Sequence, residues 1–539
     1  MSRSHPLLDL RLAQASRRHW LKRFGALGAA SFLLPAVTRD AFAQPVFVDY
    51  PFRLGVASGD PSPDGFVIWT KLMPRPLDIE ANYGMPRQPV EVQWEVARDQ
   101  AFRDIAAKGT AVAHPDLGHS VHVELAGLEP ARTYWYRFAA GRERSFVGRA
   151  RTLPAPGSRV ARVRLGVAGC QSYEQGLYTA YQHLAREELD FVYCYGDYIY
   201  EYRGRDAYFD RNSGEIHASV RRSTGDELHT IDDYRRRYAE HKMDVNLKRA
   251  HAAHPWFCVW DDHEIDNNWA GETAEDGTPP EIFRLRRIMA TQAFYEMMPL
   301  RKASFPVGER IQLHRRARWG DLLTMHFLDT RSYRSDQACG DNWAKYPCDG
   351  VNDPQAQMLG ASQERWLYEG LSEAKGQTVW QSLAQQVMVS NFHRDTKLER
   401  INLDAWAGYR VPRERLLNQV RERGLNNLVV LTGDEHQHHA LDIHAPGDDR
   451  KVLMSEFVAT SISSGGDGSP IGRGGAALLA RNPHCKLYNA QRGYLVCEVT
   501  PQRWVTDFRV LDQVSRPGGV VSSLASWAVA AGRPGLQPA

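Results

Sequence analysis

The sequence predicts a layered α/β domain over residues 158–515, preceded by a small all-β sandwich over residues 45–152. Three observations support this prediction. Short alternating or β-branched runs separated by turns dominate the N-terminal part. From residue 160 onward, strand-like apolar runs alternate with helical patterns, as in α/β proteins. The chain of 539 residues is also too long for one small module.

The N-terminal part contains three clear strand patterns, at residues 67–70, 90–96 and 120–125. Residues 127–130 read G-L-E-P and are followed by the strand-like run T-Y-W-Y-R-F. This order resembles the corner and late strand of a fibronectin-III or immunoglobulin-like sandwich. The Pro-containing stretch at 153–158 is then the predicted linker to the larger domain.

The larger domain shows the alternation of strands and helices in detail. Strands are predicted at residues 164–168, 191–195, 256–260, 322–328, 387–390, 428–431, 453–459, 494–499 and 504–510. Helices are predicted at residues 178–188, 231–253, 281–297, 363–373 and 413–423. Residues 516–539 are rich in Gly, Ala and Pro, so we expect them to form a loose C-terminal tail.

Composition and charge exclude several classes of protein. No run of about 18 apolar residues occurs, which excludes a multi-span membrane protein. The 67 basic and 64 acidic residues give a net charge of +3, which provides no overall basic field for nucleic acid. Residues 1–43 carry seven of the basic and two of the acidic residues, so the rest of the chain has a net charge of −2.

The N-terminus resembles an export signal of the twin-arginine type. Residues 16–22 read S-R-R-H-W-L-K, and a weakly apolar stretch of 14 residues follows at 24–37. The sequence A-F-A at 41–43 offers a cleavage site, which predicts a mature start at Gln44. We therefore expect the twin-arginine machinery to export the protein to the periplasm or beyond, with no membrane span after cleavage. An interfacial helix or a retained anchor is the alternative.

Seven cysteines are compatible with an exported protein, because disulfides persist outside the cytoplasm. Cys339 and Cys348 lie nine residues apart in a polar loop and are the best candidate pair. Cys485 and Cys497 are a weaker second candidate pair.

Polar side chains of unusual type follow four of the predicted strands, where ligand and catalytic groups of α/β sheets gather. They are Cys170, Asp197, Tyr200, Asp262, His263, Asp434 and His436. Taken singly, an Asp in such a place caps a turn, a Cys packs, and a His makes a structural hydrogen bond. Four such strand ends together favour a metal site with ligands of mixed hardness.

These motifs also carry a family resemblance. The order Cys, G-D-x-x-Y, D-D-H-E and G-D-x-H, at positions 170, 196–200, 261–264 and 433–436, is similar to the PhoD-like alkaline phosphatases. That family belongs to the calcineurin-like metallophosphoesterases and is related to the purple acid phosphatases. Residues 52–72 also resemble its N-terminal β-domain. The resemblance implies a layered αββα sandwich and hydrolysis of phosphate esters.

The resemblance further implies a site with one Fe(III) and one or two Ca(II). Asp197 would bridge two metals, and Tyr200 would bind the iron as a phenolate. Cys170 would bind the iron as a thiolate, and His436 would complete that site. Oxygen ligands suit calcium, so Asp262 and Asp434 would bind it together with the bridge.

The resemblance assigns the chemistry to a metal-bound hydroxide that attacks phosphorus, with His263 as the catalytic residue that stabilises charge or protonates the leaving group. The chain departs from the family at Ala407, where an Asp is expected, and this puts a second calcium in doubt. Tyr409, Asn268 and His393 are weaker candidates for contacts with substrate or calcium. A packed loop aromatic is an equally good interpretation of Tyr409.

The leading hypothesis is an exported, monomeric, metal-dependent alkaline phosphatase that hydrolyses phosphate monoesters, diesters or both. Its substrates would be small-molecule or lipid phosphate esters. A phospholipase D-type phosphodiesterase of the same family is the nearest alternative. A non-catalytic extracytoplasmic binding protein that uses the β-sandwich is the alternative from another class.

Export should depend on the arginine pair at positions 17 and 18. Changing both residues to Lys keeps the charge but removes the planar guanidinium groups, so the precursor should accumulate in the cytoplasm. Cell fractionation followed by immunoblotting measures this. Normal extracytoplasmic enzyme activity in the double variant would contradict the twin-arginine assignment.

Overall fold

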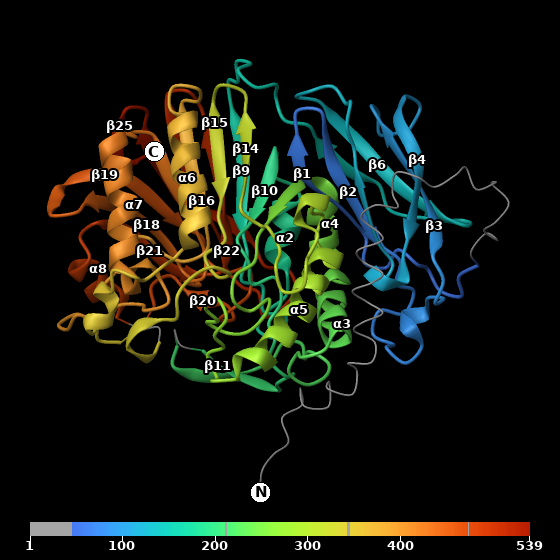
Figure 1. Ribbon diagram of the computed structural model, residues 1–539, viewed down its shortest axis with the longest axis horizontal. Coiled ribbons are helices and arrows are strands. Elements are labelled where there is room, and N and C mark those ends of the chain that lie inside the picture. Colours follow the sequence, from blue (N-terminus) through green and yellow to red (C-terminus); the bar gives the residue numbers. More distant parts are fainter. Residues whose placement is uncertain (1–45, 211–212, 342–344, 473) are drawn as a thin grey trace, which may run out of the picture.

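The computed structural model describes residues 46–210, 213–341, 345–472 and 474–539. The predicted export signal therefore lies outside the described residues. Within them, two mixed β-sheets pack face to face, and helices cover the outer face of each sheet (Figure 1). No helix in this part of the chain is long and apolar enough to cross a membrane.

The first sheet has ten strands. In spatial order they are β25 (Arg533–Pro538), β24 (Val521–Ala530), β23 (Arg503–Leu511), β22 (Gly493–Val499), β9 (Val163–Ala168), β10 (Phe191–Cys194), β13 (Pro255–Cys258), β1 (Val56–Ser62), β2 (Gly65–Lys71) and β5 (Ser120–Glu124). The strands β9, β10, β13 and β1 are parallel. Nearly all of their residues are buried, as expected for parallel strands that are covered on both faces.

The second sheet has eight strands. In spatial order they are β14 (Arg315–Trp319), β15 (Leu323–Phe327), β16 (Trp380–Ala384), β17 (Leu428–Thr432), β19 (Asp448–Val458), β18 (His438–Ala445), β21 (Cys485–Gln491) and β20 (Gly468–Ser469). Aromatic side chains join the two sheets. Phe257 stacks on Phe327 with ring centroids 4.4 Å apart, and Phe191 stacks on Trp319 at the same distance.

Helices complete the outer layers. Those packed on the first sheet are α2 (Thr179–Leu184), α3 (Ile231–Lys242), α4 (Val245–Ala253) and α5 (Pro280–Met297). Those packed on the second sheet are α6 (Gly360–Ala374) and α7 (Arg410–Arg423), while α8 (Gly475–Arg481) lies beside β21. Figure 1 shows the two helical groups on opposite sides of the paired sheets. The predicted α/β layering is thereby confirmed.

The N-terminal part shares a sheet with the rest of the molecule. Its strands β1, β2 and β5 extend the first sheet, because β1 pairs in parallel with β13. A separate five-stranded sheet packs against this extension and encloses a core of its own. That sheet contains β3 (Val90–Ala97), β4 (Ile105–Ala113), β6 (Thr133–Ala140), β7 (Glu143–Arg144) and β8 (Gly148–Arg151). One layer of the N-terminal sandwich is thus continuous with the α/β sheet.

The C-terminal tail was expected to be loose, and this expectation is wrong. Residues 521–538 form β24 and β25 at the edge of the first sheet. Strand β24 pairs with β23 along its length, and Val529 is buried in the core. Small Ala and Ser residues obscure the strand pattern, but an adjacent strand supplies hydrogen-bond partners and a surface to pack on.

Two predicted elements differ from the structure. The helix predicted at 231–253 is divided into α3 and α4, because the Asp244 carboxylate caps the second helix by accepting N–H bonds from Asn246 and Leu247. The strand predicted at 387–390 is a loop. The N–H groups of Val389 and Ser390 donate to the buried Glu456 carboxylate instead of to a neighbouring strand.

Of the two predicted disulfides, one is present in the structure and the other is not. Cys339 and Cys348 form a disulfide with an S–S distance of 2.06 Å, which confirms the first pair. Cys485 and Cys497 are free thiols, so the second pair is wrong. The reason is topological, because β21 and β22 belong to different sheets although they are consecutive in sequence.

Deleting residues 516–539 should destabilise the protein by about 3 kcal/mol or more, because it uncovers one edge of β23 and the apolar side chains beneath β24. The melting temperature of the truncated chain, measured against the full mature chain, tests this. An unchanged melting temperature would show that β24 and β25 add nothing to the first sheet.

Candidate metal centre

The four sequence motifs meet at one end of the paired sheets. Cys170 follows β9, Asp197 follows β10, Asp262 follows β13 and Asp434 follows β17. Ligand atoms from these loops form three groups in which all atoms lie within 4.8 Å of one another. The groups are Cys170 with Asp197 and His436, Asp197 with Asp262 and His263, and Asp261 with Asp262 and Asp434. Because Asp197 and Asp262 each belong to two groups, the three positions are contiguous.

The backbone at these ligands is strained. Cys170, Asp197, Asp434 and His436 have φ values of 50°, 52°, 65° and 56°, in the left-handed region that residues with a Cβ rarely adopt. Such conformations cost about 1–3 kcal/mol each and persist only where the surroundings enforce them. The loops are therefore shaped for the position of their side chains and not for their own stability.

The buried side chain of Glu264 enforces part of this geometry. One carboxylate oxygen accepts the N–H groups of Asp197 at 3.1 Å and Asp261 at 2.8 Å. The other oxygen accepts the N–H of Tyr198 at 2.6 Å. The loops after β10 and β13 are thus fastened to one carboxylate, which sets the distance between Asp197 and Asp262.

Tyr200 lies against the first group of ligands. Its hydroxyl oxygen is 2.9 Å from a carboxylate oxygen of Asp197 and 3.3 Å from Nε2 of His436. Ser464 holds this corner together, because its Oγ lies 2.6 Å from the Tyr200 hydroxyl and donates to the carbonyl of Cys170. Burial raises the pKa of the Cys170 thiol and of the Tyr200 phenol well above their usual ranges. A strongly charged cation is needed to hold both groups as anions.

His263 is oriented by a second carboxylate. Its Nδ1 lies 2.7 Å from an oxygen of Glu201, which leaves Nε2 as the nitrogen available to the site. Burial alone lowers the pKa of His263, but the surrounding Glu201, Asp262 and Asp197 carboxylates outweigh burial and raise it well above the usual range. Without a cation, these carboxylates favour the protonated imidazole over the neutral one.

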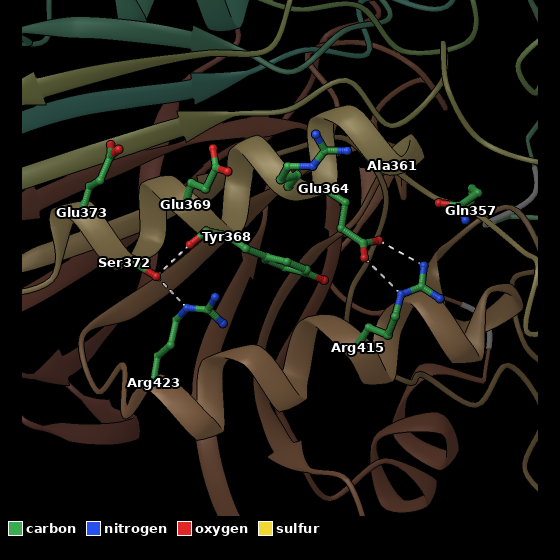
Figure 2. A pocket seen from close by; sticks show the side chains of 10 residues that line it. Gln357, Ala361, Glu364, Tyr368, Glu369, Ser372, Glu373, Arg415 and Arg423 are labelled. Carbon is green, nitrogen blue, oxygen red and sulfur yellow. Dashed lines mark hydrogen bonds and ion pairs between the residues drawn. The ribbon is translucent and has the colours of Figure 1, made fainter.

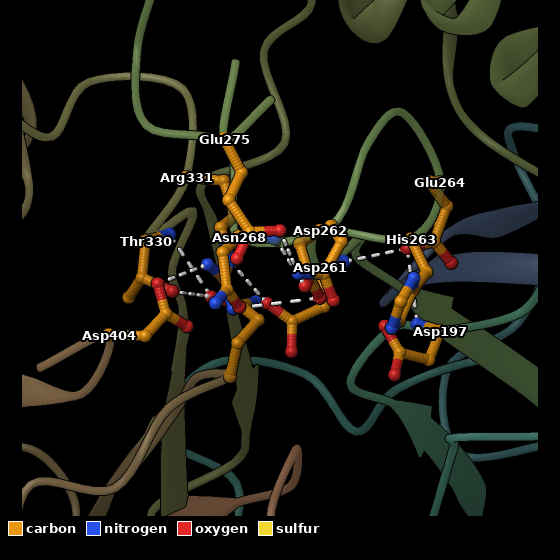
Figure 3. Close-up of polar contacts among 12 residues, drawn as sticks. Asp197, Asp261, Asp262, His263, Glu264, Asn268, Glu275, Thr330, Arg331 and Asp404 are labelled. Carbon is orange, nitrogen blue, oxygen red and sulfur yellow. Dashed lines mark hydrogen bonds and ion pairs between the residues drawn. The ribbon is translucent and has the colours of Figure 1, made fainter. Parts of the chain in front are cut away.

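Two buried arginines that were not predicted complete the cluster. Arg331 donates to Asp261 at 2.6 Å and to Asp404 at 2.7 Å (Figure 3). Arg334 also donates to Asp404, at 2.6 Å. Burial raises the pKa of Asp404, but the two guanidinium groups lower it more, and the net shift is downward. Asp404 stands in the D-A-W-A-G-Y segment and could have been noticed there. Arg331 has no signal beyond its place shortly after β15.

The cluster has the donor set that cations require. Among the described residues, Oδ1 of Asp197, Oδ1 of Asp262 and Oδ2 of Asp261 are buried and have no hydrogen-bond partner. Burial and repulsion from neighbouring carboxylates raise the pKa of Asp434 well above its usual range. Unpartnered buried carboxylates are costly unless a cation neutralises them. The residues present therefore fit a site for more than one metal ion.

The weaker candidates are placed differently. Asn268 lies in the cluster, where its N–H donates to Asp262 at 2.8 Å (Figure 3). Its side-chain amide donates to Asp341. Tyr409 is 1% exposed and its hydroxyl donates to the Ser335 carbonyl, so its ring is packed away from substrate. His393 belongs to none of the three ligand groups, and its backbone N–H donates to Asn482.

A separate cavity of about 650 Å³ lies between α6 and α7 (Figure 2). Charged side chains line it, and Glu364 and Arg415 form an ion pair across it at 3.0 Å. None of its lining residues belongs to the three ligand groups. The cavity is thus separate from the metal cluster.

Comparison with known proteins identifies the family. The model of the PhoD-like phosphatases matches residues 165–508, which is more than half of the chain. The chain belongs to this family. The model of the PhoD-like phosphatase N-terminal domain matches residues 38–154. The protein is therefore a phosphoric ester hydrolase, and the alternative of a non-catalytic binding protein is wrong.

Two relatives support the assignment. The chain is 44% identical to alkaline phosphatase D of Bacillus subtilis (strain 168) over 528 residues, which covers 97% of this chain and 88% of the relative. The solved structure titled "Structure of PhoD" superposes with a TM-score of 0.87 at 45% identity and covers 92% of this chain and 93% of that one. The fold is thus shared along nearly the whole chain.

Glu264→Gln should loosen the metal centre. The amide can accept with only one atom, and its NH₂ group faces N–H donors, so at least one buried N–H loses its partner at a cost of about 1–3 kcal/mol. Metal content after dialysis should fall before the fold does, which elemental analysis and circular dichroism can compare. Glu364→Gln, on the distant α6, is the matched control. Retention of wild-type metal content would show that Glu264 does not position the ligands.

Proposed function

We propose that the enzyme is an exported, metal-dependent alkaline phosphatase that hydrolyses phosphate monoesters, diesters or both. The observation that carries this proposal is the sharing of Asp197 and Asp262 between ligand groups, because adjacent cations bridged by carboxylates suit attack on a phosphorus atom. Export of a mature chain beginning at Gln44 through the twin-arginine route is part of the proposal.

The first position suits Fe(III). Cys170, Asp197, Tyr200 and His436 supply a thiol, a carboxylate, a phenol and an imidazole around one point. Fe(III) is a strong Lewis acid that favours deprotonated phenolate and thiolate ligands. Burial raises the pKa of the thiol and of the phenol, so both groups need a neighbouring cation to bind as anions.

The group of Asp261, Asp262 and Asp434 suits Ca(II), because it offers only oxygen atoms, and Asp262 links it to Asp197. A second calcium ion is less well supported. Ala407 provides no ligand and packs in an apolar cluster with Ile401 and Leu403. We therefore propose one iron and one calcium per chain.

Bound cations would supply Lewis acidity and would lower the pKa of a coordinated water. The residues of the chain then have distinct parts in the reaction. Glu201 holds His263 through Nδ1, so that the protonated Nε2 can donate a proton to the departing ester oxygen. Glu264 keeps Asp197 and Asp262 at a fixed separation while charge develops on the phosphoryl group.

The direct test combines elemental analysis of the purified enzyme with hydrolysis of p-nitrophenyl phosphate, bis-p-nitrophenyl phosphate and phosphatidylcholine. Stoichiometric iron and calcium with turnover of either synthetic ester supports the proposal. Hydrolysis of phosphatidylcholine alone would favour the phospholipase D-type alternative. Absence of metal from a well-folded, inactive protein would overturn both.

His263→Ala and Asp197→Ala should separate a proton-transfer role from a metal-holding role. His263→Ala should lower kcat by about 10²–10⁴-fold with metal content unchanged, and the loss should be greater for alkyl esters than for p-nitrophenyl esters. Asp197→Ala removes an atom shared by two ligand groups, so metal content should fall and all substrates should suffer alike.

The His263→Ala variant could also contradict the proton-transfer role. Loss of iron from the His263→Ala variant, or undiminished hydrolysis of alkyl esters, would make His263 a ligand or a structural residue. His393→Ala is the matched control, because His393 belongs to none of the ligand groups and its substitution should leave both metal content and kcat unchanged.

A further inference from the structure

The two-stranded sheet of β11 (Ala207–Asp210) and β12 (Glu215–Ala218) has its polar and apolar faces reversed. Phe209 pairs with Ile216 and Ala207 pairs with Ala218, so these four side chains share one face. All four are exposed, and the exposed fractions of Phe209 and Ile216 are 61% and 76%. The face that meets solvent is therefore entirely apolar.

The opposite face carries polar side chains and lies against the protein. Asp210 is buried, and Tyr208 and His217 are half-buried with ring centroids 5.8 Å apart. Amphipathic sheets ordinarily bury the apolar face. The reversed arrangement gains nothing for the stability of the chain alone, and it leaves an apolar patch without a partner among the described residues.

The apolar patch of Ala207, Phe209, Ile216 and Ala218 lies close to the metal cluster. The strands follow directly after Tyr200 and Glu201 in sequence. On their inner face, the Tyr208 hydroxyl lies so close to Gly466 that a Cβ at that position would collide with it. Gly466 belongs to the loop whose Ser464 holds Tyr200 and Cys170. A surface bound to the apolar patch is thus brought beside the ligand groups.

The size of the apolar patch argues against a second copy of the chain as its occupant. Four side chains, two of them alanines, cover far less than the roughly 800 Å² per partner of a standard protein interface. A fluid apolar layer needs no matching shape and can accept two isolated large side chains.

The flanking charges further narrow the choice of surface. Exposed residues of both signs lie on β12 or next to the two strands in the chain: Arg203, Arg205, Asp206, Glu215 and Arg222. Arg222 and Asp206 form an ion pair at 3.1 Å. This mixture offers partners to both charges of a zwitterionic headgroup. Its three arginines, offset by two acids, are fewer cations than the clusters of about four to eight basic residues that bind anionic membranes.

We propose that β11 and β12 form a docking element that inserts Phe209 and Ile216 into a zwitterionic phospholipid surface. This element would bring the metal cluster to phosphate esters carried in that surface. The inference rests on the proposed function for its purpose, but docking itself is independent of catalysis. Adsorption through two side chains is weak and reversible, which suits an enzyme that moves between substrate molecules.

Sedimentation with large unilamellar phosphatidylcholine vesicles tests the docking element. The full mature enzyme should partition onto vesicles at millimolar lipid, and the double variant Phe209→Ser, Ile216→Ser should lose at least about tenfold in partition coefficient. Phe209→Leu should retain most of the binding. Val112→Ser is the matched control, because Val112 is a similarly exposed apolar strand residue on β4, 55% exposed and in another sheet.

Several results would overturn the docking proposal. These are no partition of the wild type, equal partition of the double variant, or binding that needs anionic lipid and disappears at high salt. A concentration-dependent dimer in analytical ultracentrifugation that the double substitution abolishes would show that the apolar patch is a self-interface. Turnover of p-nitrophenyl phosphate on the same samples tests the proposed function separately, since its failure in the wild type does not affect vesicle binding.

Discussion

The structure depends on crowding several carboxylates into a dry interior. Asp197, Asp261 and Asp262 are buried at the ends of strands and Asp434 is half-buried, so water screens their repulsion poorly. Parallel strands bring their carboxyl ends to one edge, which explains how the groups meet. It does not explain why they stay charged. Neighbouring positive charges must stabilise the ionised carboxylates, and the surrounding loops place such charges or leave room for cations.

The protein supplies this charge in two different ways. At Asp404 the guanidinium groups of Arg331 and Arg334 are permanently present. Arg331 also binds one oxygen of Asp261, whose other oxygen has no hydrogen bond. At Asp197 one carboxylate oxygen is buried without a hydrogen bond, and at Asp262 the corresponding oxygen has only an ion pair with Arg331 at 3.6 Å. The division separates a fixed wall of the cluster from the part that cations complete. This difference also explains why the cluster contains many carboxylates but few places for cations.

The sequence allowed prediction of those features in which a functional residue directly follows its strand. Cys170, Asp197, Asp262 and Asp434 are of this kind, because a buried apolar run marks where each loop begins. The pairing of Arg331 with Asp404 joins residues 73 positions apart and leaves no local pattern. The tail beyond residue 516 was misjudged because alanine and serine give little alternation, although a neighbouring strand decides the outcome. The predicted strand at 387–390 failed because Glu456 binds its backbone.

The parallel pairing of β1 with β13 constrains how the two parts of the chain can evolve. Ser58 lies opposite Pro255, so the N-terminal part closes an edge that the α/β part would otherwise leave bare. Strand pairings between such distant segments form slowly, because β1 cannot pair until β13 has been synthesised. The two parts are therefore poor candidates for exchange by recombination. A foreign N-terminal part would have to reproduce the register of that edge, so the two parts are constrained to diverge together as one folding unit.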